Sequence, residues 1–372
     1  MFQNTRGEGG VLGGHGTWYV VRGFLRCKNA SDEAEPASEN TTHHAPRTFL
    51  ATTHFILPPM LSVTFLGTSA ARPTVERNVS GVALVREGET LLFECGEGTQ
   101  RQMMRYGVSF ALSEIFFTHF HADHFLGVIG LVRTLGLQAR EEPMRLYGPK
   151  GAKKLLESAL KLGVERVPFE VAIREVKPGD VIGSDSGSNH APRTTYHLEV
   201  FATEHGGGSV GYALREHERR GRFDVEKAQA AGIPEGPLWG KLSKGETVGL
   251  PDGRTVSPEG IVGPPRPGRL VVFTGDTRPC AAVVDAAQGA DLLIHEATFG
   301  EEEKDRAKET GHSTAREAAQ VALAAKARRL VLSHVSARYS ISAEELVKEA
   351  RDVFQETVVA KDGMTVEVPF ND

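Results

Sequence analysis

Cysteine is scarce in this 372-residue chain. The three cysteines, Cys27, Cys95 and Cys280, are an odd number, lie far apart and form no CxxC pair. This usage excludes a disulfide framework and a zinc site built from thiolates. It is typical of a protein that works in a reducing compartment, so we expect a cytoplasmic location.

Long apolar runs and strong charge are lacking as well. No apolar run approaches the ~20 residues of a membrane-spanning helix, and the nearest candidate, residues 49–66, is broken by His54, Pro58 and Pro59. The formal net charge of −5 argues against a polyanion bound over the whole surface but leaves room for local basic patches. The composition, 40% hydrophobic and 24% charged, is that of a soluble globular protein of one large or two mid-sized domains. We expect no membrane partner and no DNA partner.

Residues 1–59 show no sustained hydrophobic period. They combine a glycine-rich start with a stretch rich in Ser, Glu, Asn and Thr at 30–42, which is typical of disorder. The apolar stretch at 17–25 lacks the cleavage site and the uninterrupted apolar core of a signal peptide. Met60 directly precedes the first convincing strand, at 61–66. We therefore expect the folded domain to cover residues 60–372, and we hypothesise that the upstream start is over-called.

The densest polar cluster is FFTHFHADHFL at 116–126, which places His119, His121, Asp123 and His124 within six positions. Burying so many polar side chains is costly unless a metal or hydrogen bonds offset the cost. An apolar run precedes the cluster and helical spacing follows it, so the cluster is expected on a strand-to-helix turn. Such a turn can direct His119 and His121 toward one ion, and Asp123 and His124 toward another.

Strand and helix patterns alternate along the rest of the chain. Further strands are expected at 82–85, 91–94, 145–147, 171–176, 197–203, 270–274, 292–294 and 330–332, with helices from about 99, at 150–162 and at 343–354. Polar residues follow several of these strands. The pattern predicts α/β layers with a site at the strand ends.

Three of these strand ends supply ligands that the first cluster lacks. They carry His205, Asp276 in TGDT, and His334. Each of the two ions needs a further nitrogen, for which His205 and His334 are available, and Asp276 is placed to bridge the ions. Because nitrogen and oxygen donors of this kind suit zinc, with manganese as a substitute, we predict two Zn²⁺ per subunit.

Two such ions about 3.5–4 Å apart would lower the pKa of a shared water toward ~7 and clamp the oxygens of a phosphodiester. Asp123 is expected to orient this water or accept its proton. His312 in GHST is the candidate acid for the leaving oxygen, held outside a helix that begins with a Thr314 and Glu317 capping box and pointing outward; the alternative is that it only caps or packs. Glu296 in HEAT either fixes the tautomer of a catalytic histidine or is a buried, paired carboxylate.

Residues 215–267 differ from the rest in being rich in Gly, Pro, Lys and Arg and poor in apolar positions. A segment this long with so little core potential is either a functional surface arm or a disordered loop. It contains nine Lys and Arg against eight Asp and Glu. We expect substrate contacts from Arg219, Arg220, Lys241 and Lys244, and Trp239 offers a stacking or packing surface; the alternative is a solvated charge run.

Five motifs of this chain, together with His205, are THFHADH, TGDT, HEAT, GHST and LSHVSARY. As a set they resemble those of ribonuclease Z, the tRNA 3′-processing endonuclease family of the metallo-β-lactamase superfamily. The likeness runs from about residue 60 to the C-terminus and includes the PTVERN loop at 73–78, whose Arg77 is expected to contact the substrate. The resemblance implies an αββα sandwich and a homodimer in which the inserted arm grips the tRNA elbow of the partner's substrate. It also implies one zinc on His119, His121 and His205, a second on Asp123, His124 and His334, and Asp276 as the bridge.

We accordingly predict a zinc endoribonuclease that removes the 3′ trailer from precursor tRNA by attack of a bridging hydroxide and leaves a 3′-hydroxyl. One alternative is a small-molecule phosphodiesterase, lactonase or thioesterase on the same scaffold, which would have no use for the arm. The other is a non-enzymatic RNA-binding protein, against which the complete ligand set argues. Glu94, where the family usually has Asp, and the three glycines after His205 depart from the family pattern without removing a ligand.

Overall fold

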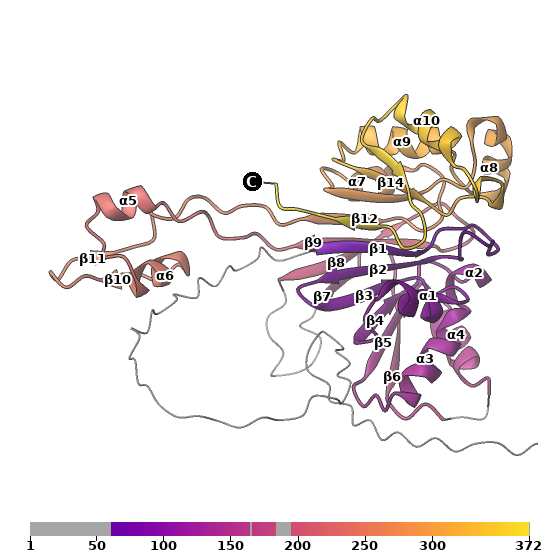
Figure 1. Ribbon diagram of the computed structural model, residues 1–372, viewed down its shortest axis with the longest axis horizontal. Coiled ribbons are helices and arrows are strands. Elements are labelled where there is room, and N and C mark those ends of the chain that lie inside the picture. The colour runs from indigo at the N-terminus through magenta and orange to yellow at the C-terminus, as the bar shows by residue number, and fades with distance from the viewer. Residues whose placement is uncertain (1–60, 164–165, 184–194, 372) are drawn as a thin grey trace, which may run out of the picture. The chain divides into compact units, whose positions relative to one another are not determined.

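Two seven-stranded mixed sheets form the centre of the computed structural model, which describes residues 61–163, 166–183 and 195–371 (Figure 1). The first sheet has, in spatial order, β16 (Thr365–Glu367), β1 (Leu61–Gly67), β2 (Gly81–Arg86), β3 (Glu89–Phe93), β4 (Leu112–Phe116), β5 (Met144–Gly148) and β6 (Val171–Glu175). The second has β15 (Thr357–Val359), β14 (Leu330–Ser333), β13 (Leu292–Glu296), β12 (Leu270–Phe273), β9 (Val210–Glu216), β8 (Tyr196–Ala202) and β7 (Val181–Gly183).

The main core lies between the two sheets. Strands β3 to β6 and strands β12 to β15 run parallel within their sheets, and buried parallel strands need apolar residues on both faces. The sequence meets this need with short runs of Leu, Val, Ile and Phe. Aromatic rings from both sheets meet in this core, where Phe93 stands 5.5 Å from Phe273 and 6.0 Å from Tyr212 between ring centroids.

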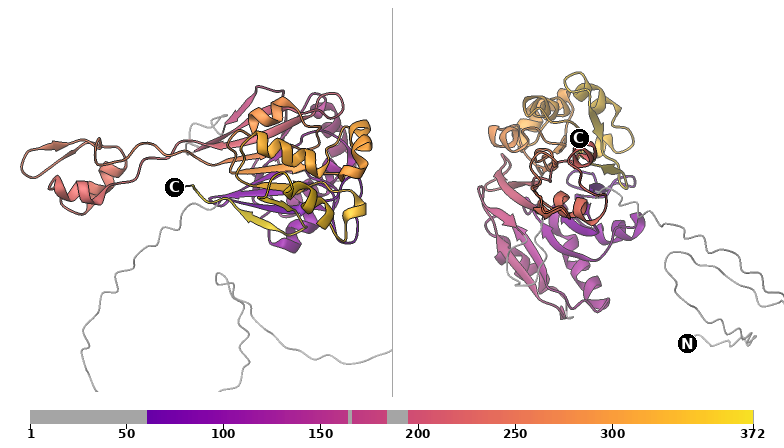
Figure 2. Two further views of the ribbon diagram at one scale, coloured as in Figure 1. Left: turned by 90° about the horizontal axis from the view of Figure 1, so that it is seen from above. Right: turned by 90° about the vertical axis from the view of Figure 1, so that its left-hand side faces the viewer.

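Helices cover the outer face of each sheet, as Figures 1 and 2 show. Those on the first sheet are α1 (Thr99–Tyr106), α3 (Gly127–Leu137) and α4 (Ala152–Leu160), and those on the second are α7 (Ala281–Ala286), α9 (Ala315–Ala324) and α10 (Glu344–Arg351). The remaining short elements of the body are α2 (Ala122–Phe125), η1 (Glu301–Glu303), α8 (Lys304–Thr310) and η2 (Ala337–Tyr339). The predicted αββα sandwich is therefore confirmed.

Most predicted strands and helices match the observed ones within a few residues. The capping box of α9 is confirmed, because the Thr314 hydroxyl accepts from Glu317 N while the Glu317 carboxylate accepts from Thr314 N. The seven-residue strand β9, the three-residue strands β7, β15 and β16 and the helices α7 and α8 were not predicted. Very short segments carry little periodicity, whereas β9 was missed despite its length. In the part of the chain that the structure describes, no helix is long and apolar enough to cross a membrane. The predicted disorder of residues 1–59 and the proposed start at Met60 lie outside the described residues.

An excursion between β9 and β12, here called the arm, spans residues 217–269 (Figure 1). It contains α5 (Val225–Ala230), α6 (Pro237–Ser243), β10 (Val248–Gly249) and β11 (Thr255–Val256). The expectation of little core potential is wrong, because six buried side chains form a small core there: Ala228, Ile233, Leu242, Val248, Leu250 and Ile261. Trp239 packs against this core, with its ring 5.3 Å from that of Phe223 and its Nε1–H donating to Ile233 O.

Candidate metal centre

Strand ends at one edge of both sheets bring the polar residues together. The turn after β4 carries two histidines and leads into α2, which carries an aspartate and a histidine; β8, β12 and β14 are each followed by one further side chain. The side chains gathered in this way are His119, His121, Asp123, His124, His205, Asp276 and His334. These are the seven that the sequence singles out as candidate ligands.

The first group consists of His119, His121, His205 and Asp276, whose ligand atoms all lie within 4.8 Å of one another. His205 Nε2 is 3.3 Å from His121 Nδ1, and His119 Nε2 is 3.6 Å from Asp276 Oδ2. Three imidazoles and a carboxylate so placed match the donors that zinc prefers.

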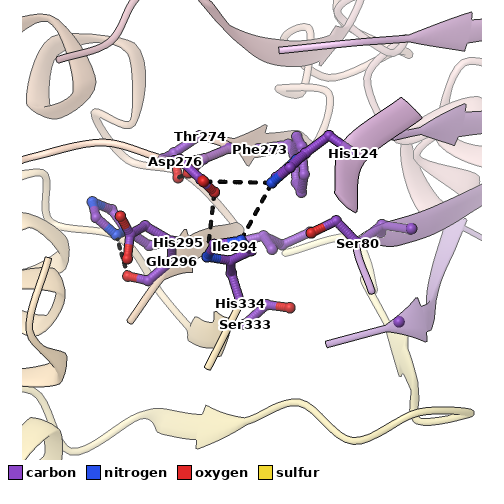
Figure 3. Close-up of a pocket in the computed structure, with 14 residues that line it drawn as sticks. Ser80, His124, Phe273, Thr274, Asp276, Ile294, His295, Glu296, Ser333 and His334 are labelled. Atoms are coloured by element: carbon purple, nitrogen blue, oxygen red, sulfur yellow. Dashed lines mark hydrogen bonds and ion pairs between the residues drawn. The ribbon is translucent and has the colours of Figure 1, made fainter. Parts of the chain in front are cut away.

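The second group consists of Asp123, His124 and His334, again within 4.8 Å. Asp123 Oδ2 is 3.3 Å from His334 Nε2 and 3.4 Å from His124 Nε2. Asp276 reaches this group as well, since its Oδ2 is 3.4 Å from His124 Nε2 and its Oδ1 is 3.4 Å from His334 Nδ1 (Figure 3). The Asp276 carboxylate therefore lies between the two groups.

Several polar atoms of these groups have no hydrogen-bond partner among the described residues although they are buried. They include His119 Nε2 and Asp276 Oδ1. Burial lowers the pKa of His119 to about 2, so this imidazole is neutral, which is the form that binds a metal. The charges of His334 and His124 hold the pKa of Asp276 well below its usual range, although burial acts in the opposite direction. A neutral His119 imidazole beside an ionised Asp276 carboxylate fits the binding of a divalent cation.

Further hydrogen bonds orient the ligand rings. His205 Nδ1 is 2.8 Å from Gly311 O, and Thr298 Oγ1 is 3.0 Å from His334 Nδ1. Glu94 is fully buried, with Oε1 3.0 Å from Thr118 N and 3.5 Å from His124 Nδ1. Such partners set the tautomer and basicity of ligand histidines. Sequence reasoning treated Glu94 only as a family difference; its signal was a carboxylate directly after the apolar strand β3.

His312 faces the two groups, contrary to the expectation that it points outward. It is half-buried, with Nδ1 2.9 Å from Glu296 Oε1 and 3.9 Å from Asp276 Oδ2. Burial alone would lower its pKa, but the charge and hydrogen bond of Glu296 outweigh this and raise the pKa of His312 to about 9. Glu296 is buried and hydrogen-bonded to His312, an arrangement that both predicted roles of this carboxylate share.

Arg278, which sequence reasoning missed, holds the loop that carries His312. Its Nη1 donates to His312 O and to Glu317 Oε2, each at 2.6 Å, and its Nη2 lies 2.5 Å from Glu317 Oε1. Its backbone N–H donates to Glu204 O at 2.9 Å, next to His205. Arg278 thus connects the loops that carry Asp276, His205 and His312.

A cleft of about 720 Å³ opens over the candidate ligands. His121, Asp123, Asp276, His312 and His334 line it. The arginines Arg72, Arg306 and Arg338 also line it. A wide cleft with cationic walls suits a large anionic substrate.

The residues predicted to contact RNA lie in three different settings. Arg77 is buried, and its Nη1 donates to Thr68 Oγ1 at 2.7 Å and to Ala360 O at 2.6 Å. The Arg77 guanidinium therefore stabilises its own loop, and the predicted contact of Arg77 with the substrate is wrong. Arg219 is half-buried at the root of the arm, while Arg220, Lys241 and Lys244 are exposed farther along it.

Known proteins similar to this chain share its fold. One family model, described as anti-Pycsar protein Apyc1, matches residues 61–217, and a β-lactamase superfamily domain matches residues 259–335. The crystal structure of human tRNase Z, short form, superposes with a TM-score of 0.58 at 29% identity, covering 83% of this chain and 100% of that one. Fold and polar cluster together define the chain as a member of the metallo-β-lactamase superfamily.

Relatives with similar sequences show which family of this superfamily the chain belongs to. Ribonuclease Z of Gemmatimonas aurantiaca is 56% identical over 311 residues, which cover 83% of this chain and 96% of the relative. Ribonuclease Z of Haloferax volcanii is 50% identical over 313 residues, covering 84% and 96%. The chain belongs to the ribonuclease Z family, and the resemblance seen in its motifs is confirmed.

Proposed function

We propose that this protein is an endoribonuclease that removes the 3′ trailer from precursor tRNA. The observation that carries the proposal is the convergence of seven ligand-type side chains beside the His312–Glu296 pair, in a chain of the ribonuclease Z family. The cationic walls of the cleft support a nucleic acid substrate over a small neutral one.

The proposed metal ligands follow the two groups and the carboxylate between them: His119, His121 and His205 for one cation, Asp123, His124 and His334 for the other, and Asp276 for both. The donor set supports zinc, with manganese as a substitute. When bound, such cations would lower the pKa of a water toward ~7 and would polarise a phosphodiester.

Two side chains have proposed roles in proton transfer. Asp123 is held by the N–H of Ala71, which donates to its Oδ2 at 2.8 Å, and it can orient the attacking water. His312 is proposed to protonate the 3′-oxygen as the P–O3′ bond breaks, which leaves a 3′-hydroxyl on the tRNA. The bond between His312 Nδ1 and Glu296 leaves Nε2 as the nitrogen that can face the leaving oxygen.

The arm is proposed to bind the body of the tRNA. Support comes from the exposed Lys241 and Lys244 on a segment that keeps its own core and contributes none of the candidate ligands. We further propose a cytoplasmic homodimer in which each arm serves the partner's active site. The free thiols of Cys95 and Cys280 are consistent with a reducing compartment.

The catalytic proposal is tested by incubating the purified protein with labelled precursor tRNA, with and without a chelator. Cleavage at the trailer junction should stop with the chelator and return when zinc is added in excess. Cleavage that is indifferent to the chelator, or no cleavage by the zinc-loaded protein, would contradict the proposal.

Deleting residues 232–246 tests the arm. The deletion should remove pre-tRNA binding and leave hydrolysis of a small phosphodiester, because the candidate ligands lie outside the arm. A milder pair of variants compares Lys241→Ala/Lys244→Ala with Lys153→Ala/Lys154→Ala, two exposed lysines on α4. Equal loss of both substrates on deletion would contradict the assignment.

A further inference from the structure

The chain after β16 reaches the root of the arm. Phe370 lies there between two arginines: the guanidinium carbon of Arg219 is 3.5 Å from its ring centroid, and that of Arg269 is 3.9 Å away. Arg219 belongs to the outgoing leg of the arm, and Arg269 ends the returning leg just before β12. One aromatic ring therefore contacts both legs through cation–π interactions.

Arg269 is a rigid member of this sandwich. It is buried, and its Nε and Nη2 each lie 2.7 Å from an oxygen of Glu216, the last residue of β9. Its Nη1 donates to Val368 O at 2.9 Å, which ties the tail to the same side chain. Arg86 of β2 completes the cluster with Nε 2.7 Å from Glu216 Oε1. The base of the arm is thus fixed to both sheets.

Arg219 is the point at which the legs leave this base. Its backbone N–H donates to Arg266 O at 2.7 Å, and the N–H of Arg266 donates back to Arg219 O at 2.8 Å. Beyond this pair the legs are joined by the isolated bridge between Phe223 and Val262 and by neighbouring backbone hydrogen bonds, and pairing of two such short segments is marginally stable by itself. Contact of Phe370 with Arg219 joins the legs to the fixed Arg269.

We propose that Phe370 is a positioning residue: it sets the direction of the arm relative to the body of its own subunit, and thereby relative to the metal centre that the arm serves. The inference rests on the proposed role of the arm in tRNA binding. The Phe370 ring is stacked between Arg269, which is buried and ion-paired, and Arg219, which is half-buried. A pre-tRNA must reach the arm and the metal centre together, so a loosened root reduces productive binding without changing the chemistry.

The test uses the full chain loaded with zinc. Phe370→Ala should raise KM for pre-tRNA about tenfold, with kcat and hydrolysis of a small nitrophenyl phosphodiester unchanged. Hydrogen exchange should accelerate at the amides of Arg219 and Arg266 but not within β12. Phe370→Tyr, which keeps the ring, should behave as wild type, and Phe370→Leu, which keeps only apolar bulk, should resemble the alanine variant.

If the arm deletion does impair pre-tRNA cleavage, two outcomes with the Phe370 variants would still overturn the inference about Phe370. One is that Phe370→Ala and Phe370→Leu match wild type in KM and in exchange. The other is that KM rises while exchange at the arm root stays unchanged, which would make Phe370 a direct contact. If deletion of residues 232–246 leaves KM for pre-tRNA unchanged, the proposed function of the arm fails first.

Discussion

The metal centre and the arm are built in opposite ways. The seven candidate ligands come from α2 and from the ends of β4, β8, β12 and β14, are mostly buried, and depend on both sheets. The arm is one continuous segment with a six-residue core of its own. Chemistry that needs a fixed array of charges is therefore distributed over the whole fold, whereas the additional binding surface is a local insertion. Changes at the centre should affect every substrate, and changes in the arm only large ones.

The largest effect is expected from Asp276→Asn, which removes the negative charge shared by both ligand groups. Hydrolysis of pre-tRNA and of a small phosphodiester should both fall at least about 10³-fold, because metal assistance contributes several kcal/mol to the barrier. Metal analysis should find less zinc per subunit. The control is Asp285→Asn, an exposed aspartate on α7. Full activity of Asp276→Asn on the small substrate would refute a metal role for this carboxylate.

A smaller effect of a different kind is expected at Arg278. Replacement by alanine frees the His312 loop, and loss of such a supporting contact typically costs about 10–100-fold in activity. The loss should appear with pre-tRNA, whose alkoxide leaving group needs a proton, and be much weaker with a nitrophenolate leaving group. His312→Ala should share this dependence on the leaving group.

The matched control for Arg278→Ala is Arg316→Ala, since Arg316 lies on α9 and pairs with Asp352 at the surface. Zinc content should stay at the wild-type value in both variants. If Arg278→Ala slows the two substrates equally, its role is general support of the fold and not the positioning of an acid.

Within the arm, Leu242→Ala should act locally. Leu242 is fully buried in the small core, and such a truncation costs about 2–5 kcal/mol. Because the arm has a core of its own, we expect it to open without the sandwich, so amide exchange should rise in α5 and α6 while the main thermal transition stays in place. KM for pre-tRNA should rise and small-substrate kinetics should not. Leu323→Ala, an exposed leucine on α9, is the control. A fall of the main transition would show that the arm is not an independent unit.

The same contrast explains what the sequence could predict. The ligands of the centre were predictable because four of them form one dense cluster after a buried strand and the other three each follow a short apolar run, and strand ends of α/β sheets meet at one edge. The capping box of α9 was predictable because both partners lie within four residues. The arm core was not, since its apolar residues are spread over a Gly- and Pro-rich segment without a period.

Buried charged residues were the main gap in the prediction. Arg77 was expected to contact the substrate and Glu216 was not singled out, yet both are buried with partners far along the chain, Ala360 and Arg269. Burial of a charge depends on contacts that no local pattern encodes. Arg278 was missed for the same reason, because its partners are near His312.

The smallest effect is expected from a change at Glu216, which lies where the arm joins the two sheets. Burial alone would raise the pKa of this carboxyl, but hydrogen bonds from Arg269 and Arg86 outweigh it and lower the pKa below the ordinary value of 4.5. The unfolded chain therefore takes up the proton first as the pH falls. The stability contributed by the ionised carboxylate is complete above pH 4.5 and is lost as the pH falls toward the pKa of the folded protein.

Glu216→Gln separates this contribution from that of other acids. At pH 7 the variant should be less stable by about 1.5–3 kcal/mol, the range for hydrogen bonds to a charged group. Since only the wild type loses the charge in acid, the difference between their urea midpoints should shrink from pH 5 to pH 3. Glu226→Gln, an exposed acid on α5, should show no such difference. A constant gap between wild type and Glu216→Gln across this range would mean that the carboxylate stabilises the arm root by its shape and not by its charge.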